Sequence, residues 1–191
     1  FLQRTMGLPL SADDVGALEA RTEGWIAGLQ LAALSLRGRD PAHLADAIAA
    51  LTGTHRYILD YLTDEVFIRQ PEEVRQFLLR TSVLDRLRGD LCDALADASG
   101  VDHAAGDAQR ILERLEAANL FLIPLDDSRV WYRYHHLFEE FLRERLRREH
   151  PDLAPELHRA ACHWYQQQGL VTEAVDHALA AGDQAPAARL I

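Results

Sequence analysis

Two adjacent histidines, His135 and His136, are the residues of this sequence whose types and spacing come closest to a reactive site. Each is followed four residues later by a carboxylate, Glu139 or Glu140. A histidine and a glutamate so placed share one helical face and can hold a metal ion, but the same spacing also makes ordinary surface pairs. Consecutive helical side chains point about 100° apart, so we expect that the two imidazoles do not face one ion, and we predict no metal site.

The short motifs that mark common catalytic and nucleotide-binding sites are missing from the sequence. It contains no GxxxxGK[ST], GxGxxG, HExxH, CxxC or GxSxG string. The phosphate cradles, zinc ligands and activated serines that these motifs provide therefore cannot be placed. We predict that the chain has no catalytic residues and is not an enzyme.

Composition predicts a globular protein of the cytoplasm. Of the 191 residues, 48% are hydrophobic and 26% are charged, as in ordinary globular domains. No apolar run approaches the roughly 18 residues of a membrane span, and no signal peptide is recognisable at the start. The net charge of -10 argues against a surface that neutralises DNA phosphates. Cys92 and Cys162 lie in apolar helical patterns, so we expect both to be buried and free.

Apolar residues recur at three- and four-residue steps through most of the chain, which is typical of helices. Ser11 is the expected N-cap of the first helix, with acids in the first turn, and Gln70-Pro71 ends one helix and begins another. The expected helices are a pair within 11–36 hinged near Gly24, then 41–51 with Pro41 in its first turn, 57–68, a helix after Pro71, 91–98, 107–119 and 135–149.

One segment departs from the helical pattern and predicts a β-hairpin. Residues 120–125 form a short apolar run, 126–129 have turn chemistry, and 130–134 are rich in β-branched and aromatic residues. A helical block, a hairpin and a long helix are the order of a winged-helix module. A lone hairpin is marginal in water, so a helical layer must cover one of its faces.

After Pro151 the sequence becomes rich in alanine and predicts the start of a helical repeat. Helices are expected at 154–168 and 171–181, followed by a turn at 182–183 and the start of a third helix. A helix-turn-helix unit of about 30 residues is typical of stacked arrays. The predicted fold class is thus mainly α, with a winged-helix-like module containing one β-hairpin and then the start of an α-helical superhelix.

Four strings in a fixed order resemble one family. They are TEGWIAGLQLAALSL (22–36), ILDYLTDEVFIRQPEEVRQFLLRTSVLDRL (58–87), NLFLIPLDDSRVWYRYHHLFEEFLRERL (119–146) and AACHWYQQQGLVTEAVDHALAAGD (160–183). They look like the MalT-like family of signal-transduction ATPases, which are ATP-dependent transcriptional regulators with a LuxR-type DNA-binding end. The resemblance implies a helical lid of a nucleotide-binding module at 1–55, a winged-helix-like module at 56–150 and the first helices of a helical-repeat sensor domain at 151–191.

The resemblance also implies site residues and a cofactor. In the wider class, a histidine of a Met-His-Asp type string reaches the β-phosphate of ADP, and His135 takes that position in Tyr134-His135-His136-Leu137. Gly24 and Ile26 fall where many members carry Gly-x-Pro, whose proline touches adenine. We therefore expect His135, Gly24 and Ile26 to bind ATP or ADP in the full-length protein, with no cofactor in the fragment. The alternative is that His135 caps its helix or packs beside Trp131.

The function implied by the resemblance is regulatory. The fragment would couple nucleotide state to inducer sensing and oligomerisation in an ATP-dependent transcriptional activator. Its partners would be an upstream ATPase core, downstream sensor and DNA-binding domains of the same chain, a small-molecule inducer and a second copy in a homo-oligomer, with no membrane and no direct nucleic-acid binding by this fragment.

Two alternatives remain from the residues themselves. The first is a DNA-binding winged-helix regulator, which requires a continuous basic face around Arg143–Arg148 that Glu144 does not interrupt. The second is a small helical enzyme with a His/Glu site at His135, which requires an ordered carboxylate or a metal ion on that imidazole in a buried pocket.

Overall fold

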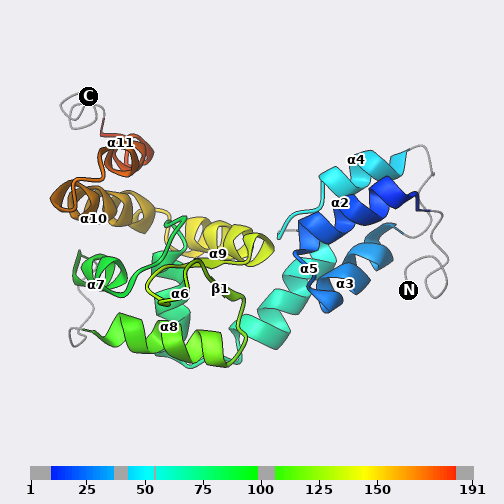
Figure 1. The fold of residues 1–191 in the computed structure, drawn as a ribbon, viewed down its shortest axis with the longest axis horizontal. Coiled ribbons are helices and arrows are strands. Elements are labelled where there is room, and N and C mark those ends of the chain that lie inside the picture. Colours follow the sequence, from blue (N-terminus) through cyan, green and yellow to red (C-terminus); the bar gives the residue numbers. More distant parts are fainter. Residues whose placement is uncertain (1–9, 37–42, 54, 99–105, 184–191) are drawn as a thin grey trace. The chain divides into compact units, whose positions relative to one another are not determined.

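The protein is described by a computed structural model that covers residues 10–36, 43–53, 55–98 and 106–183. These residues form helices and one two-stranded antiparallel hairpin, which confirms the predicted fold class (Figure 1). The chain divides into two compact units. The first contains the described residues up to Arg69 together with His135–Phe141, and the second contains Gln70–Tyr134 and the described residues from Leu142 onward. No helix of the described residues is long and apolar enough to cross a membrane.

The first unit is built from short helices and a π-helical turn. They are α2 (Ala12–Thr22), α3 (Ile26–Leu36), α4 (Leu44–Ala49), α5 (Arg56–Tyr61) and the π-helix η2 (Leu62–Phe67). The Ser11 hydroxyl accepts a hydrogen bond from the Asp14 backbone N–H, and the Asp14 carboxylate accepts one from the Ser11 N–H. This capping box confirms Ser11 as the N-cap of α2.

The predicted hinge near Gly24 is present between α2 and α3. Glu23 and Gly24 both adopt left-handed backbone conformations, with φ of 47° and 76°. Glycine accepts such angles at no steric cost, whereas glutamate does not. Around this hinge, α2, α3 and α4 bury an apolar cluster made of Leu10, Leu18, Ala32, Ala33, Leu36, Leu44, Ile48 and Leu51.

The second unit holds the winged-helix elements and the first two helices of the Ala-rich region. They are α6 (Glu72–Thr81), α7 (Gly89–Ala98), α8 (Asp107–Ala117), β1 (Leu122–Pro124), β2 (Tyr132–Tyr134), α10 (Leu153–Gln167) and α11 (Val171–Ala180). Helix α9 (His136–Glu149) begins in the first unit and ends in the second. Cys92 in α7 and Cys162 in α10 are buried and free, as expected.

The hairpin forms where the turn chemistry predicted it. Leu122 pairs with Tyr134 and Pro124 with Tyr132. On the other edge of β2, Tyr132 forms an isolated antiparallel bridge with Leu87. The Asp126 carboxylate accepts hydrogen bonds from the backbone N–H groups of Val130 and Trp131, which closes the turn and lowers the pKa of this carboxyl. Helix α8 packs on β1 and supplies part of the helical cover that a lone hairpin needs.

The structure differs from two of the expected helices. The continuous helix expected at 57–68 changes from α5 to a π-helix at Leu62, a local widening that side-chain periodicity does not report. The helix expected from Pro41 is helical from Leu44. Pro41 itself and the expected third helical start after Asp183 lie outside the described residues.

A pair of histidines joins α10 to α11. The Nδ1 atoms of His158 and His177 lie 2.8 Å apart in a hydrogen bond, and the ring of His177 stacks on Tyr165 at 5.3 Å. Burial, followed by the charges of His177 and Arg143, lowers the pKa of His158 to about 4, while Asp85 opposes the shift. Burial also lowers the pKa of His177, against Asp85, Asp176 and Glu173. Both rings therefore favour the neutral form in the folded state.

We expect this pair to make the second unit sensitive to acid. Unfolded histidine titrates near 6.5 and folded His158 near 4, so the unfolded chain binds the proton first and stability falls as the pH drops from 6.5 toward 4. His158→Asn should remove on the order of 1 kcal/mol of that fall, after allowance for solvent screening. Urea unfolding at pH 7.5 and pH 5 measures it, with exposed His163→Asn as the control. Equal pH dependence in all three proteins would contradict the expectation.

Candidate functional site

His135 caps the N-terminus of α9 instead of lying inside it. Its carbonyl oxygen accepts hydrogen bonds from the N–H groups of Phe138 and Glu139, both at 2.9 Å. Its Nδ1 atom accepts a further bond from the Leu137 N–H at 3.3 Å. The capping alternative considered for this residue is therefore present in the structure.

The other nitrogen of His135 reaches a distant helix. Its Nε2 atom lies 2.7 Å from the backbone carbonyl oxygen of Thr22, at the end of α2. Because Nδ1 accepts from Leu137, the hydrogen-bond pattern assigns the proton to Nε2, which donates to the Thr22 carbonyl. The residue is 5% exposed, so this bond satisfies a donor that burial would otherwise leave unpaired.

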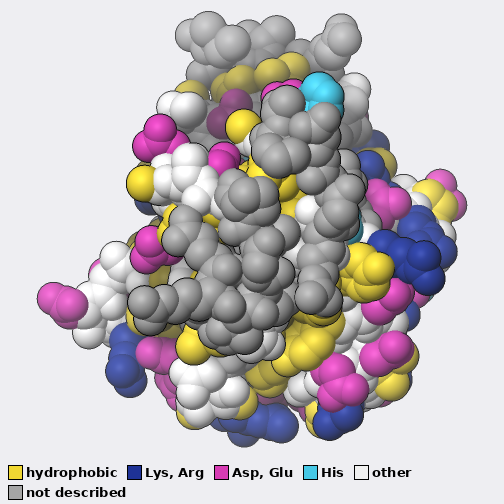
Figure 2. All heavy atoms as spheres, turned by 90° about the vertical axis from the view of Figure 1, so that its right-hand side faces the viewer, with side chains coloured by type: hydrophobic (Ala, Val, Ile, Leu, Met, Phe, Trp, Pro, Cys, Tyr) yellow, Lys and Arg dark blue, Asp and Glu magenta, His cyan; other side chains and the backbone are white. Residues whose placement is uncertain are grey.

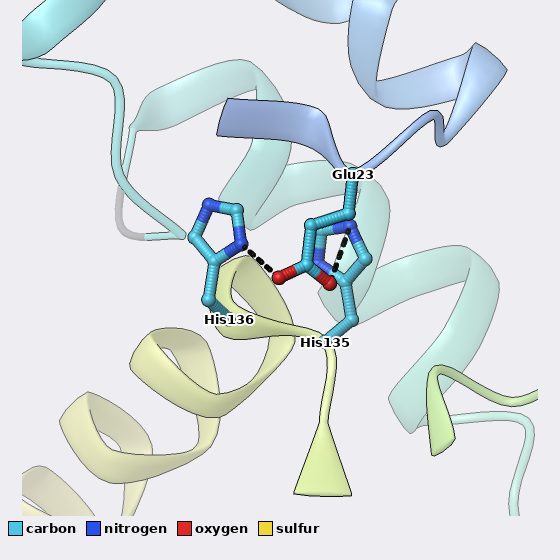
Figure 3. Close-up of side chains that lie close together, drawn as sticks. All are labelled: Glu23, His135 and His136. Carbon is cyan, nitrogen blue, oxygen red and sulfur yellow. Dashed lines mark hydrogen bonds and ion pairs between the residues drawn. The ribbon is translucent and has the colours of Figure 1, made fainter. Parts of the chain in front are cut away.

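Glu23 is the central residue of the cluster. One carboxylate oxygen lies 3.0 Å from Nδ1 of His136 and the other lies 3.8 Å from Nε2 of His135, as Figure 3 shows. The two imidazoles are stacked, with centroids 5.0 Å apart and planes inclined by 15°. The expectation that they point about 100° apart is wrong, because His135 precedes the first helical residue and does not follow helical spacing.

Trp25 lies beside His135, where the alternative considered for this histidine had placed Trp131. The rings of Trp25 and His135 are 6.0 Å apart, and Tyr61 packs on the same indole at 5.5 Å. Trp131 instead meets Trp164 in the second unit. Trp25 is half-buried. Gly28 makes room for it, since a Cβ there would lie 2.2 Å from the indole Cε3.

The segment that carries the other two predicted site residues lies at the same place. Thr22, Glu23 and Trp25 all contact or approach the His135 ring, and Gly24 and Ile26 alternate with them along the chain. Gly24 has open space around it. Ile26 is 71% exposed, so an apolar side chain is available on the surface next to the hinge. The structure thus brings the neighbourhoods of all three predicted residues together.

The start of α9 is fixed by a second set of contacts. The Gly53 N–H donates to one carboxylate oxygen of Glu140 at 2.7 Å, and the Arg21 guanidinium lies 4.0 Å from the other. A Cβ on Gly53 would lie 1.8 Å from the Leu137 carbonyl oxygen. The chain at Gly53 therefore touches the backbone of α9 so closely that only glycine fits.

This arrangement can offer one directed N–H donor and a set of metal-binding atoms. Among the described residues, Glu23, His135 and His136 are the group of three potential ligands whose donor atoms lie within 4.8 Å of one another. Glu23 was missed from the sequence because its partners are more than 100 residues away, although it stands in the predicted hinge. Both nitrogens of His135 are engaged in hydrogen bonds, which does not suit a free general base.

Comparison with known proteins identifies the region. Residues 63–154 match the family model described as the MalT winged helix domain. The chain is 40% identical over 185 residues to the "HTH-type transcriptional regulator MalT" of Klebsiella pneumoniae and 39% identical to that of Yersinia pestis, in each case over 96% of its length. This chain belongs to the MalT-like family. The hairpin and helices α6–α9 accordingly fall within the residues that match the MalT winged helix domain.

The MalT-like segment occurs in a second kind of protein. The chain is 41% identical over 185 residues to the "Serine/threonine-protein kinase PknK" of Mycobacterium tuberculosis, over 97% of its length. It spans 16% of that relative and 20% of the two MalT proteins. It therefore corresponds to one region of much longer, multidomain relatives.

We expect Gly53→Ala to destabilise the first unit of this MalT-like chain. The new methyl group would push against the Leu137 backbone, and such overpacking costs about 1–3 kcal/mol. Gly16→Ala is the matched control, because a Cβ there meets nothing within 4 Å and alanine in a helix is favoured by about 0.5–1 kcal/mol. Thermal unfolding followed by circular dichroism compares the two. A Gly53→Ala protein as stable as the wild type would show that the close approach does not exist.

Proposed function

We propose that this chain is the regulatory segment of an ATP-dependent transcriptional regulator, in which it couples nucleotide state to inducer sensing and oligomerisation. The observation that carries the proposal is the hydrogen bond between His135 and Thr22. In this bond the Nε2–H of His135, which caps α9, donates to a backbone oxygen at the end of α2, in the segment that the resemblance implies to be the lid. A phosphate oxygen is a chemically similar acceptor.

Three features of these residues favour a bound nucleotide, and one feature opposes it. His135 provides an N–H donor beside the positive end of the α9 dipole. Gly24 offers unobstructed backbone, and Ile26 offers exposed apolar surface for a purine. The Glu23 carboxylate, 3.8 Å from Nε2, would repel a phosphate, so it must turn away when His135 changes acceptor. ADP or ATP, when bound, supplies the anionic oxygen that replaces the Thr22 carbonyl.

The coupling would act through α9. Its first turn belongs to the unit that contains the hinge, and its later turns belong to the unit that contains the wing and the Ala-rich helices. When His135 leaves the Thr22 carbonyl for another acceptor, the contact that holds the start of α9 changes. Both units contain part of this helix. A ligand shifts such an equilibrium only if it binds the two states unequally, and this requirement applies to nucleotide and inducer alike.

The relatives support a role that is neither catalysis nor DNA binding by this segment. Nearly the whole chain matches one protein named as a kinase and others named as transcriptional regulators. A segment common to proteins with such different outputs fits a shared controlling step. We therefore propose that the segment is not an enzyme by itself and that catalysis and DNA binding belong to other regions of the longer protein.

The charges on α9 argue against the alternative of a groove-reading winged helix. Arg143 pairs with Asp85 at 2.6 Å, and two further arginines pair with glutamates of the same helix at 2.7 and 2.9 Å, namely Arg147 with Glu144 and Arg145 with Glu149. Acidic and basic side chains are also interspersed among the described residues of the face in Figure 2. A surface that binds phosphates would present its cations unpaired and gathered together.

The test is nucleotide affinity in the complete polypeptide. We expect His135→Ala to weaken ADP binding at least about tenfold, since a hydrogen bond to a charged group contributes about 1.5–3 kcal/mol. His135→Gln, whose amide N–H can still donate, should recover part of the loss. Fluorescent-ADP titration measures both.

His163→Ala is the matched control, because His163 is exposed on α10 and bonds only locally to Gln167. Circular dichroism checks that each variant is folded. A folded His135→Ala protein that binds ADP as tightly as the wild type would refute the nucleotide role of this residue.

A further inference from the structure

We propose that Glu23, His135 and His136 form a binding site for a divalent transition-metal ion of the zinc type. Two imidazoles and one carboxylate with open positions are a ligand set that such ions accept. The three side chains come from the hinge after α2 and from the start of α9, and they converge on one point in Figure 3.

The donor atoms are close to a binding arrangement. Nδ1 of His136 lies 3.0 Å from one oxygen of Glu23, and Nε2 of His135 lies 3.8 Å from the other. All three ligands lie within 4.8 Å of one another. Ligands about 2.0–2.2 Å from a zinc ion on opposite sides stand at most about 4.4 Å apart, so a small side-chain movement completes the site. The Thr22 carbonyl, 2.7 Å from Nε2, adds an oxygen at the same place.

The local charges favour a cation. Glu23 carries a negative charge at the C-terminal end of α2, where the helix dipole is also negative and an anion is disfavoured. With both imidazoles neutral, the three ligands carry one negative charge and no positive charge. A dication neutralises the carboxylate and lies at the negative end of the α2 dipole. These two attractions offset its repulsion by the positive end of the α9 dipole.

Binding moves protons within both rings without a net release. Nε2 of His135 and Nδ1 of His136, the nitrogens that face Glu23, each give up a proton to solvent and the other nitrogen of each ring takes one up, because a metal-bound imidazole coordinates through an unprotonated nitrogen. The contact from the Leu137 N–H to Nδ1 of His135 is then lost. That bond is long, at 3.3 Å, and it belongs to the first helical turn, whose N–H groups lack intrahelical partners in any case.

A titration of the nucleotide-free chain with Co²⁺ tests the site, since Co²⁺ occupies zinc sites and absorbs visible light when coordinated by imidazole. We expect one Co²⁺ per chain, displaced by Zn²⁺, and paramagnetically shifted NMR signals from two imidazole rings. Glu23→Gln and His136→Gln should each weaken binding at least about tenfold, the scale on which changes around a metal site act.

Glu19→Gln, an exposed change in the same helix, and His163→Gln are the matched controls and should bind as the wild type does. Absence of a Co²⁺ spectrum in the wild-type chain would overturn the proposal, as would equal binding by folded Glu23→Gln and His136→Gln. Because the experiment contains no nucleotide and His136 has no part in the proposed nucleotide contact, this result is independent of the His135→Ala measurement with ADP.

Discussion

The hydrogen bond from His135 to the Thr22 carbonyl is the constraint on which the first unit depends. It joins residues 113 positions apart, and both partners are buried. A buried donor left without an acceptor costs about 1–3 kcal/mol, so the end of α2 and the start of α9 must stay together or find other partners. Glu23, Trp25 and His136 lie around this bond, with the Glu23 carboxylate 3.8 Å from Nε2 and the rings of Trp25 and His136 beside the imidazole.

Two glycines, Gly28 and Gly53, are as important to the cluster around His135 as the side chains that form it. Gly53 allows the chain to touch the backbone of α9, and Gly28 leaves space for the indole of Trp25. A methyl group at Gly53 would overlap the Leu137 backbone of α9, and one at Gly28 would overlap the Trp25 side chain. The Glu140 carboxylate then receives the Gly53 N–H, so the close approach is also satisfied as a hydrogen bond. Gly53 thus sets the distance at which its own N–H meets Glu140, and Gly28 sets the position of the Trp25 ring beside His135.

Local chemistry predicted much of the fold, and long-range geometry limited the prediction of the site. The Ser11 cap, the helix start at Pro71 and the turn at Asp126 each depend on neighbouring residues, and each appears as predicted. Glu23 has no local feature that points to histidines beyond residue 130. The wrong angle between His135 and His136 has a simple cause, because the helix begins one residue later than expected and helical spacing does not apply across its cap.

The Nε2–H group of His135 faces two acceptors, the Thr22 carbonyl and the Glu23 carboxylate. Nε2–H of His135 bonds to the Thr22 carbonyl although the charged Glu23 carboxylate lies 3.8 Å away. Hydrogen bonds to charged groups contribute about 1.5–3 kcal/mol and those to neutral groups about 0.5–1.5 kcal/mol. The carboxylate is held back because it already accepts from His136 at 3.0 Å. A ligand that binds more tightly when Nε2–H has left the Thr22 carbonyl therefore shifts this choice of acceptor, and one that binds both arrangements equally does not.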